Sequence, residues 1–132
     1  SYDDDADASG EADESDYEES DVTVLTDDNF EAEVEGKDAM LEFYAPWCGH
    51  CQSLKPTYKE LGTRLVDADV VVGAMDATAH TPPAEYEVQG YPTLIFKTAS
   101  GKTTSYDGDR DVDSMVTYIK ENAEAESVKS EL

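Results

Sequence analysis

The sequence predicts an α/β domain in which a central mixed β-sheet carries helices on both faces. From Val22 onward, short apolar runs alternate with amphipathic ones, which is typical of strands that alternate with helices. The chain then closes with a predicted hairpin and a final helix, so part of the sheet should be antiparallel. Its 132 residues give room for one such domain with a proper core.

The first half of this pattern predicts two strands and two helices. Residues 22–25 form an apolar run that predicts a strand, and residues 26–29 then offer side-chain oxygens that can cap a helix. We expect this helix to reach about Glu35 and to end at Gly36. Residues 40–44 predict a second strand. A longer helix should begin at the cysteines that follow, because apolar residues recur there at helical spacing: Leu54, Tyr58, Leu61 and Leu65.

The second half predicts a buried strand, a hairpin and a closing helix. Residues 70–75 are nearly all apolar, as expected for a strand that is covered on both faces. After the Thr-Pro-Pro sequence at 81–83, a short helix should follow to Tyr86. Residues 93–97 and 103–106 predict a hairpin. The last helix should begin near Asp111 and bury four apolar residues: Val112, Met115, Val116 and Ile119.

The two ends of the chain differ in composition from the domain. Residues 1–21 contain eleven acidic and no basic residues, so they carry nearly half of the net charge of −23. Such a segment buries too little apolar surface to order itself, and we expect a disordered acidic tail. The domain should then span residues 22–125, with a C-terminal tail at 126–132. Clustered carboxylates such as Asp3 to Asp5 allow weak calcium binding, although the regular spacing of a rigid calcium loop is absent.

The overall charge bears on the partners that the protein can have. An acidic surface argues against nucleic acid and against anionic membranes. No apolar run approaches the length of a membrane span. We expect a monomer that needs no cofactor.

The cysteine pair is the strongest sign of chemistry in the sequence. Cys48 and Cys51 are the only cysteines, and two residues separate them where a predicted strand gives way to a predicted helix. Two thiols placed in this way can close a small disulfide ring and reopen it. At a helix start, the first sulfur meets unpaired backbone N–H groups and the positive end of the helix dipole, which favour thiolate over thiol. The pattern indicates a dithiol redox catalyst.

Two other interpretations of the pair have less support. A zinc site usually needs four ligands, and His50 and His80 are the only other soft ligands in the chain. His50 lies within the loop between the cysteines, where it can hardly complete a tetrahedron with both neighbours. A purely structural disulfide would close so short a loop that it would constrain the unfolded chain little.

The chain resembles the thioredoxin fold and, more narrowly, a catalytic domain of the protein disulfide isomerase family. The resemblance covers about residues 22–125 and includes Gly49 and His50 between the cysteines, where reducing thioredoxins typically have Gly-Pro. It rests on five motifs in order: Val24-Leu25-Thr26 with Asn29-Phe30, Phe43 to Cys51, Met75 to Thr78, Gly90 to Thr93, and Tyr106 with Gly108 and Arg110.

The resemblance assigns roles to Cys48, His50 and Cys51 and to the residues around them. Cys48 should be the attacking thiolate that forms a mixed disulfide with the substrate, and Cys51 should be the resolving thiol. When His50 is protonated, its charge should stabilise the Cys48 thiolate and so make the disulfide more oxidising. Pro92 takes the position of the family's cis-proline, which lies against the disulfide. Trp47 and Tyr91 are expected beside it in the substrate-binding surface.

The resemblance also implies two residues that assist proton transfer at the resolving thiol. Glu42 lies within an apolar strand, where burial favours its neutral form, and it corresponds to the family's buried acid beneath Cys51. The lysine that usually pairs with this acid is replaced by Ala74. Arg110 corresponds to an arginine that can swing toward the resolving thiol.

The C-terminal residues point to a cellular compartment. Lys129-Ser130-Glu131-Leu132 resembles the KDEL signal that the retrieval receptor of the endoplasmic reticulum binds. We therefore expect a thiol–disulfide oxidoreductase of the endoplasmic-reticulum lumen that acts on cysteine-containing secretory polypeptides, with glutathione or a thiol oxidase as its redox partner. The alternatives are a reductant of the thioredoxin type and a non-catalytic acidic protein that binds calcium or clients.

Overall fold

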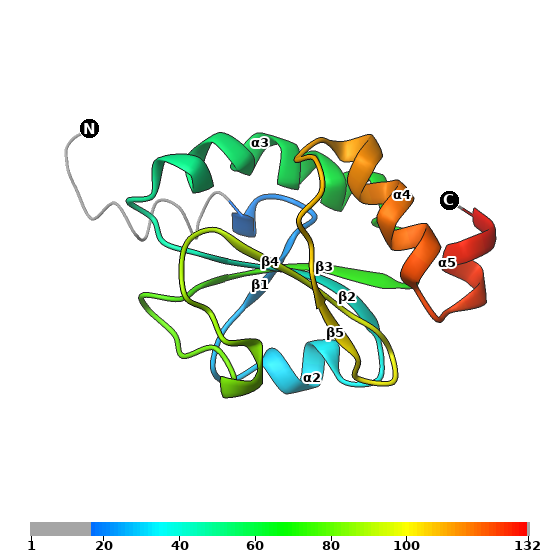
Figure 1. Ribbon diagram of the computed structural model, residues 1–132, viewed down its shortest axis with the longest axis horizontal. Helices are drawn as coiled ribbons and strands as arrows, with labels where there is room; N and C mark the ends of the chain where they lie inside the picture. The colour runs from blue at the N-terminus through cyan, green and yellow to red at the C-terminus, as the bar shows by residue number, and fades with distance from the viewer. Residues whose placement is uncertain (1–16, 132) are drawn as a thin grey trace.

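The computed structural model describes residues 17–131, with side chains to residue 129. These residues form a mixed five-stranded sheet with helices packed against it (Figure 1). The strand order is β1-β3-β2-β4-β5. The first three strands in the chain are parallel, β4 runs antiparallel to β2, and β5 forms a hairpin with β4. The strands are β1 (Thr23–Leu25), β2 (Asp38–Tyr44), β3 (Val70–Asp76), β4 (Thr93–Lys97) and β5 (Thr103–Ser105).

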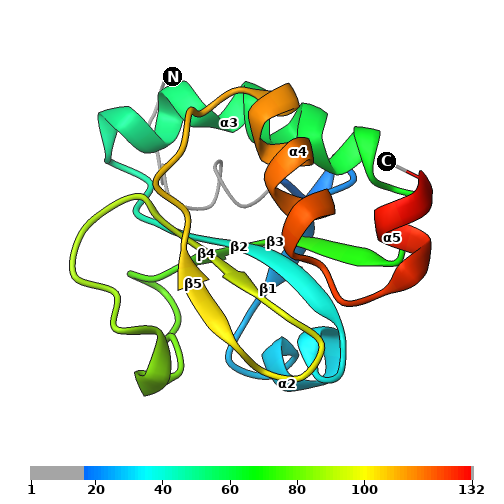
Figure 2. The ribbon, with the colours of Figure 1, turned by 45° about the vertical axis from the view of Figure 1, so that its right-hand side comes forward.

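Helices cover both faces of this sheet, as Figures 1 and 2 show from two directions. The long helix α3 and helix α4 lie together on one face, and the short helix α2 lies on the other. The helices are α2 (Phe30–Val34), α3 (Gly49–Arg64), the 3₁₀ turn η1 (Ala84–Tyr86), α4 (Val112–Asn122) and α5 (Glu126–Glu131). The predicted α/β fold with its mixed sheet is therefore confirmed, and Val112, which we expected to be buried, is only partly buried.

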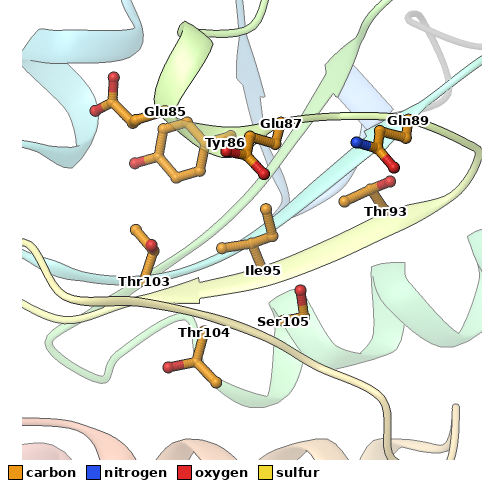
Figure 3. A pocket seen from close by; sticks show the side chains of 9 residues that line it. All are labelled: Glu85, Tyr86, Glu87, Gln89, Thr93, Ile95, Thr103, Thr104 and Ser105. Carbon is orange, nitrogen blue, oxygen red and sulfur yellow. The ribbon is translucent and has the colours of Figure 1, made fainter.

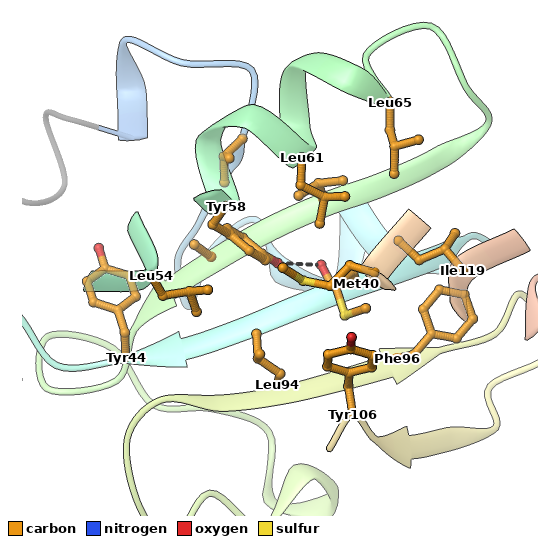
Figure 4. Packing of buried hydrophobic residues seen from close by; sticks show 14 of the residues in the cluster. Met40, Tyr44, Leu54, Tyr58, Leu61, Leu65, Leu94, Phe96, Tyr106 and Ile119 are labelled. Atoms are coloured by element: carbon orange, nitrogen blue, oxygen red, sulfur yellow. Dashed lines mark hydrogen bonds between the residues drawn. The ribbon is translucent and has the colours of Figure 1, made fainter. Parts of the chain in front are cut away.

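The alternation of side chains along β2 divides the core into two halves. All seven residues of β2 are buried, because the strand lies between β3 and β4 and beneath helices on both sides. Met40 and Tyr44 point toward α3 and α4, where they pack with Leu61, Phe96 and other apolar residues (Figure 4). Leu41 and Phe43 belong to the cluster on the opposite face. Glu42 is thereby placed on the same face of β2 as α3.

Tyr58 joins α3 to the middle of the sheet. Its side chain is fully buried, and its hydroxyl lies 3.0 Å from the carbonyl oxygen of Met40 (Figure 4). The same hydroxyl lies 2.7 Å from the carbonyl oxygen of Gly73. The hydroxyl therefore bonds to the backbone of both β2 and β3, which fixes the height of the helix above the strands. Helix α3 continues through Pro56 without a break.

Buried polar groups hold the far end of the sheet. The carboxylate of Asp38, the first residue of β2, accepts hydrogen bonds of 2.9 to 3.1 Å from the backbone N–H groups of Ala99, Glu124 and Ala125. These bonds tie the β4–β5 turn and the connection after α4 to the start of β2. The cysteine motif follows the other end of β2, so this network does not take part in its chemistry.

The folded unit begins before Val22, in contrast to the boundary that the sequence predicts. Tyr17, which we assigned to the disordered tail, is 1% exposed and belongs to the core cluster under α3. Asp21 also contacts the domain, because its carboxylate accepts a 2.9 Å hydrogen bond from the hydroxyl of Thr63. An aromatic ring was enough to bury part of an otherwise acidic segment. The rest of the predicted tail, residues 1–16, lies outside the described residues, as do Asp3 to Asp5.

The folded unit also extends beyond residue 125, where the sequence predicts that the domain ends. Residues beyond Ala125 form α5, and Val128 is completely buried against the core. Residues 126–131 are therefore part of the folded unit rather than an open tail. Leu132 of the predicted retrieval signal lies outside the described residues. Within the described part of the chain, no helix is both long enough and apolar enough to cross a membrane.

Candidate active site

The cysteine motif occupies the turn between β2 and α3. Cys48 directly precedes the first residue of α3 and has an extended backbone, which turns its side chain back over the start of the helix. Its sulfur accepts a hydrogen bond from the backbone N–H of Cys51 at 3.3 Å. This is the arrangement in which a helix start stabilises a thiolate.

A glutamine that the sequence analysis did not single out supports this turn. The side-chain amide of Gln52 donates a 2.8 Å hydrogen bond to the carbonyl oxygen of Pro46, and the N–H of Cys48 bonds to the carbonyl oxygen of Ala45. Together these bonds fix the loop on which Cys48 sits. No sequence signal identifies Gln52, because its partner is a backbone atom.

The two thiols have different environments although both are free in this structure. Cys48 is 8% exposed and Cys51 is 4% exposed. The pKa of the Cys51 thiol is raised to about 12, chiefly by burial, with smaller contributions from the hydrogen bond with Cys48 and the charge of Glu42. Cys51 therefore holds its proton at neutral pH, and it needs a proton acceptor before it can become a thiolate.

Three residues that the sequence predicts for the substrate surface meet at Cys48. The Cys48 thiol donates to the carbonyl oxygen of Tyr91 at 3.5 Å, and the peptide bond between Tyr91 and Pro92 is cis, as we expected. The Trp47 side chain is 69% exposed and packs edge-on against Tyr91, with ring centroids 5.8 Å apart. An exposed aromatic surface thus lies directly beside the first sulfur.

The remaining residues of the motif are exposed. Gly49 and His50 form the start of α3, and a Cβ atom added at Gly49 would meet nothing within 4 Å, so a substrate has room to approach.

Arg110 is exposed in the loop between β5 and α4, and no hydrogen bond or ion pair connects it to Cys51 in the described part of the chain. The structure thus brings His50 to the cysteines and leaves Arg110 apart from them.

Glu42 is buried beneath the motif, with an exposed fraction of 1%. Ala74, which replaces the lysine expected from the resemblance, lies directly beside it in the register of β2 and β3. The hydroxyl of Tyr17 instead donates a 2.8 Å hydrogen bond to Oε1 of Glu42. Glu42 also raises the pKa of both Cys51 and Tyr58, after burial as the larger cause, so its charge acts on the neighbouring face of α3.

Tyr17 is therefore a site residue that the sequence analysis missed. It lies 25 positions before Glu42, in a segment whose composition predicts disorder. The one available signal was an aromatic residue close to the first strand.

Other features of the described chain lie away from the cysteines. A pocket of about 320 Å³ lies between η1 and the β4–β5 hairpin (Figure 3). Its lining residues are Glu85, Tyr86, Glu87, Gln89, Thr93, Ile95, Thr103, Thr104 and Ser105. Within residues 17–131, no group of three or more His, Cys, Asp or Glu side chains is arranged to hold a metal ion.

Comparison with known proteins identifies the family. The sequence profile of the family described as Thioredoxin matches residues 21–121, which is most of the chain. The chain belongs to the thioredoxin family. Within this family it is similar to protein disulfide-isomerase of Zea mays, with 51% identity over 106 residues, and to protein disulfide-isomerase A3 of Gallus gallus, with 45% identity over 115 residues. The resemblance inferred from the sequence is thus confirmed.

A solved structure gives the same relationship at the level of the domain. This thioredoxin-family chain is similar to the first thioredoxin domain of mouse protein disulfide-isomerase A4, with 37% identity and a TM-score of 0.68 over 76% of this chain and 74% of that one. The two sequence relatives are much longer proteins. The alignments cover 78% and 83% of this chain but only 21% and 23% of the relatives.

Proposed function

We propose that this chain is a thiol–disulfide oxidoreductase and isomerase, which forms, reduces and rearranges disulfides in secretory polypeptides. One observation carries the proposal. The Cys48 sulfur caps α3 and accepts the N–H of Cys51, while Cys51 is buried behind it with its proton held. In this proposal the Cys48 sulfur attacks the substrate, and Cys51 stays protonated until it attacks the mixed disulfide.

The first step of the proposed mechanism is attack by Cys48 on a substrate disulfide. The Cys48 thiolate forms a bond to one substrate sulfur, and the substrate's S–S bond breaks. The second substrate sulfur leaves as a thiolate and takes a proton from solvent. The N–H of Cys51 stabilises the attacking thiolate, and exposed His50 adds positive charge beside it when it is protonated.

The second step releases the substrate. Cys51 gives its proton to the carboxylate of Glu42 and attacks the Cys48 sulfur, so that the Cys48–Cys51 disulfide forms and the bond to the substrate breaks. The substrate has then gained two electrons and the dithiol has lost two. Glu42 suits this role because it is buried on the same side of the sheet and its charge already acts on Cys51. Arg110 would have to move from its exposed position to assist.

The reverse sequence oxidises a substrate dithiol. Return of the disulfide to Cys48 and Cys51 then requires an oxidant, for which we propose glutathione disulfide or a thiol oxidase. Rearrangement requires neither, because a substrate thiol can attack the mixed disulfide before Cys51 does.

Substrate recognition in this proposal uses the surface around Cys48. The exposed ring of Trp47 offers apolar contact area, and Tyr91 stands edge-on beside it. The carbonyl oxygen of Tyr91, which accepts from the Cys48 thiol, is released for a substrate N–H when that thiol has reacted. Pro92 follows in the same loop. These contacts involve the backbone more than particular side chains, so they fit many extended polypeptides.

We also propose the endoplasmic-reticulum lumen as the place of action. The named isomerase relatives and the C-terminal residues 129–132 support this assignment. A retrieval receptor is then a further partner, and weak calcium binding by the acidic N-terminal residues is a property to be measured.

Redox equilibration with glutathione tests the proposed function. The two thiols are trapped by alkylation at a series of glutathione ratios, and the fraction of disulfide gives the reduction potential. An isomerase should have a reduction potential of about −180 mV, whereas a potential of about −270 mV would make the chain a thioredoxin-type reductant. Reduction of insulin that persists in Cys48→Ser would exclude the dithiol mechanism.

A further inference from the structure

Tyr17 contacts the active-site carboxylate from the N-terminal segment that precedes β1. Its ring packs edge-on against Tyr44 and Tyr58, with centroids 5.6 Å and 6.1 Å away, and its hydroxyl donates to Oε1 of Glu42 at 2.8 Å. The two neighbouring tyrosines come from β2 and α3 (Figure 4). The N-terminal segment therefore reaches the space between the sheet and the catalytic helix.

Local hydrogen bonds hold Tyr17 in this position. Its carbonyl oxygen accepts from both the N–H and the hydroxyl of Ser20, at 3.0 Å and 2.6 Å. The Ser20 hydroxyl accepts in turn from the N–H of Val22, and the Asp21 carboxylate accepts from Thr63 on α3. The turn before β1 is thus attached to α3, and the phenol is directed at Glu42.

The same tyrosine closes one side of Cys51. Tyr17 and Cys51 line a common crevice with Gln52 and Lys55, and this crevice is too narrow to hold a water molecule. Solvent therefore has no room on this side to take the proton of Cys51. On this side the available acceptor is a group of the protein, and Glu42 is a buried carboxylate whose charge acts on that thiol.

We propose that Tyr17 is a positioning residue for the resolving step, because its hydroxyl keeps the Glu42 carboxylate ionised and oriented to accept the proton of Cys51. The proposal rests on the proposed function, in which Cys51 displaces the substrate from Cys48. In that step the Cys51–Cys48 bond forms, the bond from Cys48 to the substrate breaks, the substrate leaves as a thiolate, and the Cys51 proton moves to Glu42.

The direction of the effect follows from the hydrogen bond. A donor to a carboxylate favours the charged form, so loss of the phenol hydroxyl should let Glu42 take up a proton at higher pH. Titratable groups that interact with Glu42 include Tyr17 from the N-terminal segment and Cys51 and Tyr58 from α3. Both Tyr17 and Tyr58 stay neutral in the working range, because burial raises the pKa of each well above its ordinary value.

Single-turnover kinetics of the full chain test the proposal. The reduced protein is mixed with glutathione disulfide and quenched in acid, and the decay of its glutathione mixed disulfide is followed between pH 5 and 9. Tyr17→Phe keeps the ring and removes the hydroxyl. In this variant the pH below which release of glutathione slows should rise by about one unit, and at lower pH the release should be about tenfold slower than in the wild type. Tyr106→Phe is the matched control, because its buried ring also carries a hydroxyl, which bonds to the backbone of Asp109 away from Glu42.

Glu42→Gln separates the possible outcomes. A shifted profile in Tyr17→Phe, with Tyr106→Phe like the wild type and Glu42→Gln slow, supports the proposal. If Glu42→Gln is slow but Tyr17→Phe follows the wild-type profile, Tyr17 is only structural and the proposal is overturned. If Glu42→Gln itself releases the mixed disulfide normally, Glu42 is not the proton acceptor, and the Tyr17 proposal fails while the redox function of Cys48 and Cys51 stands.

Discussion

The Cys48 thiol donates to the carbonyl oxygen of Tyr91 at 3.5 Å, across 43 residues of sequence. This contact connects the start of α3 with the loop before β4, and it puts the Cys48 sulfur against the backbone of Tyr91. Cys51, three residues further on, has no such access because α3 carries it inward. The different positions of the two sulfurs lead to the first prediction.

Iodoacetamide at pH 7 should modify Cys48 and spare Cys51 in the reduced protein. The thiolate is the reactive form, and burial raises the pKa of Cys51 to about 12, so few Cys51 thiolates exist at that pH. Peptide mass spectrometry should find Cys51 at least about a hundredfold slower to react. In Cys48→Ser the remaining thiol should stay slow, and in denaturant both should react. Comparable rates in the folded protein would show that Cys51 is accessible.

His50→Pro should make the disulfide less oxidising. In the proposed mechanism, the positive charge of protonated His50 favours the Cys48 thiolate and so the reduced form, and proline is tolerated in the first turn of a helix. The reduction potential, measured against glutathione, should fall by about 30 mV or more, which corresponds to about 1.4 kcal/mol. His80→Gln is the control, because His80 pairs with Asp27 instead of lying between the cysteines. An unchanged potential in His50→Pro would remove His50 from the mechanism.

Tyr17→Ala should destabilise the domain although Tyr17 lies in an acidic segment. The substitution leaves a cavity between Tyr44 and Tyr58, and loss of a buried aromatic side chain costs about 3–5 kcal/mol. Urea denaturation measures the free energy of unfolding. Glu18→Ala, at an exposed neighbour, should stay within about 0.5 kcal/mol of the wild type. Deletion of residues 1–21 should cost at least as much as Tyr17→Ala, and an unaffected truncation would contradict the burial of this residue.

The domain should lose stability in alkaline solution because of its buried tyrosines. Burial raises the pKa of Tyr17 and Tyr58 well above the value of about 10 in the unfolded chain. Between the unfolded and the folded pKa of a buried tyrosine, the unfolded chain binds fewer protons than the folded one. The contribution of these tyrosines to the free energy of unfolding is therefore fully present below about pH 10 and falls as the pH rises. Each group should contribute a slope of about 1.4 kcal/mol per pH unit.

Phenylalanine variants test this slope in urea titrations at several alkaline pH values. Tyr17→Phe and Tyr58→Phe should each reduce it, since each removes one raised group. Trp47→Phe, a change at an exposed ring that does not titrate, should leave it unchanged. A Tyr17→Phe variant with the full wild-type slope would mean that Tyr17 ionises equally in the folded and unfolded states.

The local pattern of the chain was enough to predict its fold and its reactive pair. Strand and helix periods identify β2, β3 and α3 because each is a contiguous segment whose apolar spacing reflects the surface it buries. The position of Cys48 at a helix start likewise follows from its neighbours in sequence, and the cis bond before Pro92 agrees with the motif around it.

Only the tertiary structure decided which residues complete the site. Tyr17 donates a hydrogen bond to Glu42, which lies 25 positions further along the chain. The composition of residues 1–21 nevertheless predicts disorder, because a single aromatic ring hardly changes the average of a segment with eleven acidic residues. Val128 is buried in a similar way within a polar C-terminal segment. Apolar periodicity records the average environment of a segment. The burial of a single side chain depends on a gap that distant elements leave, and here β2 and α3 leave that gap beneath Cys51.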